Sequence, residues 1–221
     1  QRLPLRKRRD GMLKSFTQAA ADYCAAAKNR TRQSVPRLLV LGILAGMFIA
    51  LAGTAASVGG ALAGKIASAA IFPAGLAMVI LAGSELFTGN CLFLLPLLRG
   101  DITGGRTMGS WAVVYCGNLI GSIVIAFIVV RCGVLDSIAP AAIATAAAKA
   151  SLPFGAAFLR GVLCNLLVCL AVWMAFCAGS AGGKVISLYG PIFLFVLCGF
   201  EHSIANMFYL PAGILLSGGA E

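Results

Sequence analysis

The sequence carries little charge. Only 11% of its 221 residues are charged and 60% are hydrophobic, whereas charged residues make up about 25% of an ordinary soluble domain. Several apolar runs also reach the ~20 residues that a helix needs to cross a bilayer. These features exclude an ordinary water-soluble globule and predict an all-α polytopic membrane protein.

Histidine is the rarest chemically active residue, with His202 as the single copy, and no pair of cysteines has the C-x-x-C spacing. A structural or catalytic metal site needs several ligands, and a membrane haem subunit usually needs paired axial histidines. We therefore expect no metal and no cofactor, which disfavours a membrane subunit of an enzyme complex. We interpret the eight cysteines as small apolar packing residues: Cys24, Cys91, Cys116, Cys132, Cys164, Cys169, Cys177 and Cys198.

Positive charge is concentrated at the amino end. The formal net charge is +10, and ten of the 17 basic residues lie in residues 1–37. Such a cluster before a first membrane span is typical of a cytoplasmic flank that touches anionic lipid. It predicts a membrane-surface segment and no binding of nucleic acid.

The composition divides the chain into three parts. Residues 1–11 form a basic tail, residues 12–34 an amphipathic cytoplasmic helix with Leu13 on its apolar face, and residues 35–221 a transmembrane channel domain. Ser15 and Gln18 have the spacing of a capping box at the start of the amphipathic helix.

Five membrane spans are predicted, with a looser connection over residues 131–153. If the amino terminus lies in the cytoplasm, that side holds 13 of the basic residues, as the positive-inside rule requires. The localisation expected is the cell (inner) membrane. The spans are 37–58, 71–98, 108–130, 154–178 and 185–216.

Two of these spans are interrupted by the same motif. Residues 83–93 and 199–209 share the spacing Gly-x-Glu-x-x-x-x-Asn-x-x-aromatic at a constant offset of 116 residues. Paired interrupted spans in two halves of a membrane protein indicate a substrate site between the halves. The second and fifth helices are therefore expected to be broken.

The positions of the breaks also predict an inverted repeat. Repeat one covers about 35–133, and an incomplete repeat two covers about 150–221. An odd number of spans reverses the second half, and the symmetry would call for a sixth span that this sequence does not contain.

Polar residues at the breaks are the candidate site. Glu85 and Glu201, with Asn90 and Asn206, are expected to hold the broken helices by hydrogen bonds. His202 is expected to face the permeating solute, because an imidazole that titrates near neutral pH can offer a proton or a positive charge to an anion.

Four segments together resemble the formate/nitrite transporter family: residues 83–90, 117–122, 163–175 and 199–207, in the order of that family. The resemblance covers roughly residues 12–221. It implies aquaporin-like protomers of six spans that assemble as a homopentamer, each protomer with its own pore.

The resemblance also implies residue roles. The central histidine would be His202, the threonine that approaches it Thr88, the mid-helix asparagine Asn165 and the basic residue of the outer vestibule Lys149. The constriction residues would be Phe72, Leu76, Leu86, Phe87, Val168 and Phe195.

The function expected is a channel for small monovalent anions of weak acids, with formate, nitrite and hydrosulfide as candidates and protons as a coupled partner. Lys149 and Arg160 would attract the anion, and His202 would make permeation dependent on pH. The alternative is an aquaporin-like pore for small neutral solutes, although the Asn-Pro-Ala motif of such pores is missing.

Overall fold

The computed structural model of the chain describes residues 15–218, and every regular element in that range is a helix. By length and composition, four segments are long and apolar enough to cross a membrane, namely Val35–Ala82, Gly104–Arg131, Phe154–Cys177 and Ala181–Cys198. The two shorter apolar helical segments are Phe87–Leu98 and Ser203–Leu216. The prediction of an all-helical polytopic membrane protein is confirmed. Leu13 and the basic tail lie outside the described residues.

Helix α1 (Phe16–Arg30) is the predicted amphipathic helix. The Ser15 hydroxyl accepts a hydrogen bond from the Gln18 backbone N–H at 3.3 Å, as the capping box predicted. The Gln18 side chain instead donates to Asp22 at 2.7 Å. Only the serine half of the box is therefore formed.

Two predicted boundaries were wrong. The first span was predicted to end at residue 58, with the next beginning at 71, but α2 (Val35–Ile71) continues through this stretch with non-helical angles only at Ala63 and Gly64. Alanine has the highest helix propensity, and the first proline after this stretch is Pro73, which opens α3 (Pro73–Ala82).

The connection over 131–153 is also mostly helical. It contains α7 (Ala139–Ala150), which follows the short 3₁₀ turn η2 (Asp136–Ile138). Eight alanines and a proline in the first turn explain this helix, since alanine has the highest helix propensity and the fixed φ of proline suits a first turn.

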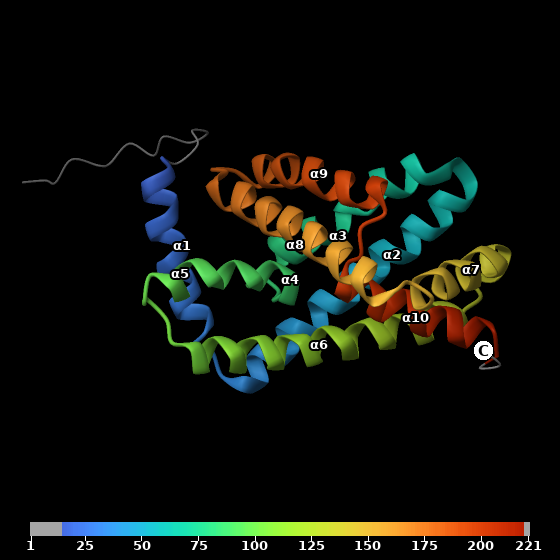
Figure 1. Cartoon of the computed structure of the whole chain (residues 1–221), viewed down its shortest axis with the longest axis horizontal. Coiled ribbons are helices and arrows are strands. Elements are labelled where there is room, and N and C mark those ends of the chain that lie inside the picture. The colour runs from blue at the N-terminus through green and yellow to red at the C-terminus, as the bar shows by residue number, and fades with distance from the viewer. Residues whose placement is uncertain (1–14, 219–221) are drawn as a thin grey trace, which may run out of the picture.

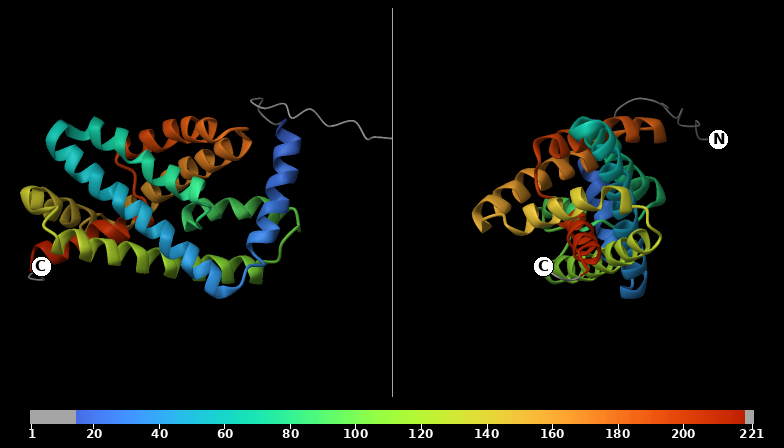
Figure 2. Two further views of the ribbon diagram at one scale, coloured as in Figure 1. Left: turned by 180° about the vertical axis from the view of Figure 1, so that it is seen from behind. Right: turned by 90° about the vertical axis from the view of Figure 1, so that its right-hand side faces the viewer.

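The remaining helices complete two groups. The first contains α4 (Phe87–Asn90), η1 (Cys91–Phe93), α5 (Leu94–Leu98) and α6 (Gly104–Arg131), and the second contains α8 (Phe154–Cys177), α9 (Ala181–Cys198) and α10 (Ser203–Leu216). Helix α6 lies along one long edge of the molecule and α9 along the other, with α2 crossing between them (Figures 1 and 2). Helices α1 and α7 lie at opposite ends (Figure 1).

Glycines allow α2 and α6 to touch backbone to backbone. A Cβ on Gly46 would collide with the backbone oxygen of Asn118, and one on Gly121 with the backbone oxygen of Ile43. The Ser122 hydroxyl donates to the Gly46 carbonyl across the same interface at 3.3 Å. Small residues drive helix association in membranes in this way, because they permit close approach.

Both breaks begin with the same helix ending. Gly83 and Gly199 adopt left-handed angles, with φ of 68° and 72°. The next residue donates back five positions in each case, from Ser84 to Val79 and from Phe200 to Phe195, both at 3.0 Å. This is a Schellman ending, for which glycine is the usual residue.

Asn118 of α6 satisfies the exposed backbone of the first break. Its Oδ1 accepts from the Phe87 N–H at 2.9 Å, and its Nδ2 donates to the carbonyls of Gly42 and Glu85 at 2.8 and 3.0 Å. The side chain is completely buried. Backbone groups inside a membrane must be paired within the protein, so Asn118 makes the first break possible.

We expect Gly121→Ala to lower the free energy of unfolding by about 1–3 kcal/mol, because its methyl group would push α2 away from α6. Thermal unfolding in detergent measures the effect. Gly109→Ala on the same helix is the matched control, since nothing lies within 4 Å of its Cβ position. Equal melting temperatures for the two variants would contradict this account.

We expect Asn118→Leu to destabilise the protein by on the order of 3 kcal/mol, because three buried backbone groups lose their partner. Asn165→Leu serves as the control. The Asn165 Oδ1 accepts no hydrogen bond from any described residue, so its removal costs little. If the two variants have the same melting temperature, Asn118 does not support the break.

Candidate functional site

Two cavities approach the middle of the molecule. The first, about 470 Å³, is lined by residues of α2, α7, α9 and α10, including Lys65, Lys149 and His202. The second, about 220 Å³, is lined by residues of α1, α3, α8 and α9, including Arg30 and Lys184. Helices α7 and α1 lie at opposite ends of the molecule (Figure 1), so the first cavity is on the α7 side and the second on the α1 side.

A buried apolar cluster separates the cavities. It contains five of the six predicted constriction residues, Phe72, Leu76, Leu86, Val168 and Phe195. Phe72 and Phe195 line the first cavity and their ring centroids are 5.7 Å apart, edge to face. Leu76 and Leu86 line the second cavity.

His202 and Thr88 meet within this barrier. The His202 Nε2 lies 3.1 Å from the Thr88 Oγ1, and both residues are only 4% exposed. Thr88 is in the first turn of α4, and His202 is the N-cap of α10. The two broken helices thus bring together residues that are 114 positions apart.

The cap fixes the hydrogen-bonding state of His202. Its Nδ1 accepts a hydrogen bond from the Ala205 backbone N–H at 3.0 Å. A nitrogen that accepts carries no proton, so the proton of the neutral ring is on Nε2. Nε2–H then donates to Thr88, which leaves the threonine hydroxyl hydrogen for another acceptor.

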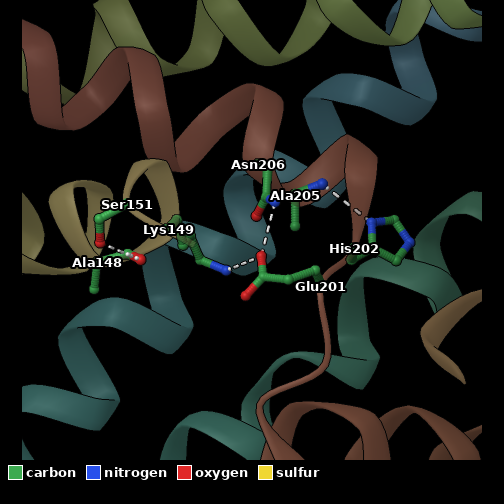
Figure 3. Close-up of polar contacts among 7 residues, drawn as sticks. All are labelled: Ala148, Lys149, Ser151, Glu201, His202, Ala205 and Asn206. Carbon is green, nitrogen blue, oxygen red and sulfur yellow. Dashed lines mark hydrogen bonds and ion pairs between the residues drawn. The ribbon is translucent and has the colours of Figure 1, made fainter. Parts of the chain in front are cut away.

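Glu201 points away from His202, toward α7 (Figure 3). Its Oε2 accepts from the Lys149 Nζ and from the Asn206 Nδ2, each at 2.8 Å. Lys149, predicted as a vestibule cation, therefore lines the first cavity as half of an ion pair. The partner of the histidine is Thr88 and not the adjacent glutamate.

Glu85 has the same arrangement at the first break. Its Oε2 accepts from the Asn90 Nδ2 at 2.8 Å, and its Oε1 lies 3.4 Å from the Arg30 Nε. Sequence reasoning missed Arg30. A signal was present, since Arg30 precedes Glu85 by 55 residues and Lys149 precedes Glu201 by 52.

Trp111 is a second residue that sequence reasoning missed. Its indole Nε1 donates to the Asn90 carbonyl at 3.0 Å and so holds α4 against α6. A tryptophan within an apolar span gives no sequence signal for such a contact.

Phe87, Asn165 and Arg160 are predicted residues that line neither cavity. Phe87 packs its ring against Tyr115 and Trp111 of α6, at 5.0 and 6.2 Å between centroids. Asn165 donates to the Cys169 Sγ at 3.8 Å. Arg160 is exposed on α8. Phe87 nevertheless packs against the apolar cluster, whereas Asn165 and Arg160 are not among the residues of that cluster.

The sequence of the chain matches known proteins over most of its length. The family model described as "Formate/nitrite transporter" matches residues 17–221. A protein of Methanothermobacter thermautotrophicus named "Probable formate transporter" is 39% identical, over 93% of this chain and 85% of that protein. "Formate channel FocA" of Haemophilus influenzae is 37% identical, over 89% and 73%.

Solved structures agree with these matches. A structure titled "FNT family ion channel" has a TM-score of 0.82 and 31% identity, covering 89% of this chain and 83% of that one. A "Pentameric formate channel with formate bound" has a TM-score of 0.74 and 34% identity, covering 85% and 78%. The chain belongs to the formate/nitrite transporter family of membrane channels, which are not enzymes.

Proposed function

We propose that the protein is a channel for small monovalent anions of weak acids, with formate as the first candidate and nitrite and hydrosulfide as further ones. The observation that carries the proposal is the His202–Thr88 contact inside the apolar barrier between two cavities. The relatives named as formate transporters and channels support formate as the substrate to test.

The barrier explains why a bare ion does not pass freely. Taking a charge out of water into a low-dielectric passage costs several kcal/mol or more. Two donor groups lie inside the barrier: the Thr88 hydroxyl, whose hydrogen is free, and the His202 Nε2–H, which can exchange its bond to Thr88 for one to the solute. Hydrogen bonds to charged groups contribute about 1.5–3 kcal/mol each, so these donors offset part of the cost for an oxyanion.

The cap on His202 couples protonation to the start of α10. A second proton on the ring must go to Nδ1, which accepts the Ala205 N–H. Protonation therefore breaks this cap while it creates a cation beside the passage. In our proposal, acid strengthens the attraction of His202 for the anion, and the cost of the lost cap limits how easily the ring is charged.

The two halves support an inverted repeat around this site. Each break has a left-handed glycine, a glutamate that accepts from an asparagine five residues later, and a cation supplied by a preceding short helix. These cations, Arg30 of α1 and Lys149 of α7, come from opposite ends of the molecule (Figure 1). In the described part of the chain, no counterpart of α6 packs on α8.

A homopentamer with cytoplasmic amino termini is the assembly we propose. The pentameric relative supports the number of subunits. Helix α8 supports an apolar contact surface, since Phe154, Phe158, Leu159 and Leu166 are 59–85% exposed. The excess of basic residues on the α1 side supports the orientation.

We expect His202→Phe to reduce formate flux into proteoliposomes by about 10- to 100-fold, because it removes one hydrogen bond to the charged solute. We also expect the remaining flux to lose its pH dependence. Flux is measured at about pH 5.5 and about pH 7.5, because these values bracket the usual titration of imidazole. The flux through protein-free vesicles is subtracted.

His202→Asn is the matched control for the helix cap. Asparagine is a good N-cap but does not titrate in this range, so this variant is expected to keep the fold and to lose the pH dependence. A variant that passes formate with the wild-type pH profile would remove His202 from the mechanism.

A further inference from the structure

Each cavity contains one cation whose charge is already compensated. Lys149 lies 2.8 Å from Glu201 at the first cavity, and Arg30 lies 3.4 Å from Glu85 at the second. An ion pair has little net charge at the distance of an approaching solute. These two residues therefore present little net charge to anions in solution, so attraction at each cavity falls to its other cation.

Lys65 is the other cation of the first cavity, and it forms no ion pair with any residue in the range 15–218. It follows the non-helical pair Ala63 and Gly64 in α2, which turns the chain at this rim. Its ammonium group would lie 3.6 Å from a Cβ placed on Gly199, the residue that ends α9. The lysine is exposed, so its charge faces the solution.

Lys184 is the corresponding residue of the second cavity. It is half-buried in the first turn of α9, and its ammonium group has no partner among the residues that the structure describes. A cation at this end of a helix opposes the helix dipole. The position therefore gives the helix no stability that would explain the lysine.

No other titratable group at the rims cancels these charges. In the first cavity the remaining titratable groups are Glu201, which is paired with Lys149, and the neutral side chains of His202 and Tyr209. In the second cavity, burial raises the pKa of the Tyr23 hydroxyl, so it stays neutral. Each cavity thus keeps one unpaired positive charge.

We propose that Lys65 and Lys184 are the residues that concentrate the anion at the two mouths of the passage, whereas Lys149 and Arg30 brace the broken helices through the glutamates. This inference rests on the proposed function. Clefts with a net charge raise the local concentration of oppositely charged solutes, and the effect falls with ionic strength.

The two pairs of cations have matching spacings. Lys65 precedes Lys184 by 119 positions and Arg30 precedes Lys149 by 119, three more than the offset of 116 between the two break motifs. Each half therefore supplies one paired cation before its first long helix, Arg30 or Lys149, and one unpaired cation before its break, Lys65 near the end of α2 or Lys184 in the first turn of α9. In an inverted repeat, equivalent residues lie on opposite sides of the membrane, which provides each mouth with one free charge.

The test compares Lys65→Gln, Lys184→Gln and the double variant in proteoliposomes loaded with formate. We expect each single change to lower formate flux by about two- to fivefold at an ionic strength of about 0.01 M, where the Debye length is about 30 Å. The difference from wild type should vanish near 1 M, where the Debye length is about 3 Å. Lys65→Arg and Lys184→Arg should retain wild-type flux.

Lys28→Gln and Arg131→Gln control for the loss of a positive charge outside the cavities. Lys28 lies on the α1 side and Arg131 on the other, and both residues are exposed and line neither cavity. If the glutamine variants of Lys65 and Lys184 match these controls at low salt, or if the arginine variants lose as much flux, the inference is wrong while the proposed function stands. A wild-type protein that passes no formate contradicts the proposed function itself.

Discussion

A helix that stops inside a membrane exposes backbone groups that water cannot reach, and the structure depends on how these groups are paired. Glycine endings turn the chain at both breaks, and the buried amide of Asn118 bonds the backbone on either side of the first break. Without such partners each exposed group costs several kcal/mol. The pairing allows residues of α4 and α10 to reach the centre.

The two motif glutamates show how charge is used in this fold. Each one accepts from an asparagine and from a cation on a short helix at the end of the molecule. A buried carboxylate needs such compensation. In our proposal, the passage is therefore left with neutral donors at its centre, and the uncompensated charges lie at its mouths.

Much of this arrangement could be predicted from the sequence, because it rests on local patterns. The motif of residues 83–93 and 199–209 located both breaks, and the family resemblance paired His202 with Thr88. The pairing of Glu85 with Arg30 has only the similar spacing of Lys149 and Glu201 as a sequence signal, because the contact depends on how α1 folds back against the membrane helices. The orientation of Phe87 toward Tyr115 likewise depends on packing against α6.

The helical nature of 59–71 and 139–150 was missed for another reason. Alanine- and glycine-rich stretches between spans resemble links in composition, and only the propensity of alanine distinguishes them. These segments contribute to the first cavity, because α7 supplies Lys149 and the last part of α2, after its kink, supplies Lys65. Composition alone gave no reason to place either lysine at a cavity.

The central claim is that the barrier between the cavities passes small anions. Stopped-flow measurement of formate and water permeability in the same proteoliposomes tests it most directly. The account predicts formate flux well above that of protein-free vesicles, with water permeability close to theirs. Raised water permeability with formate flux at the level of the lipid alone would contradict it, and would indicate a pore for neutral solutes.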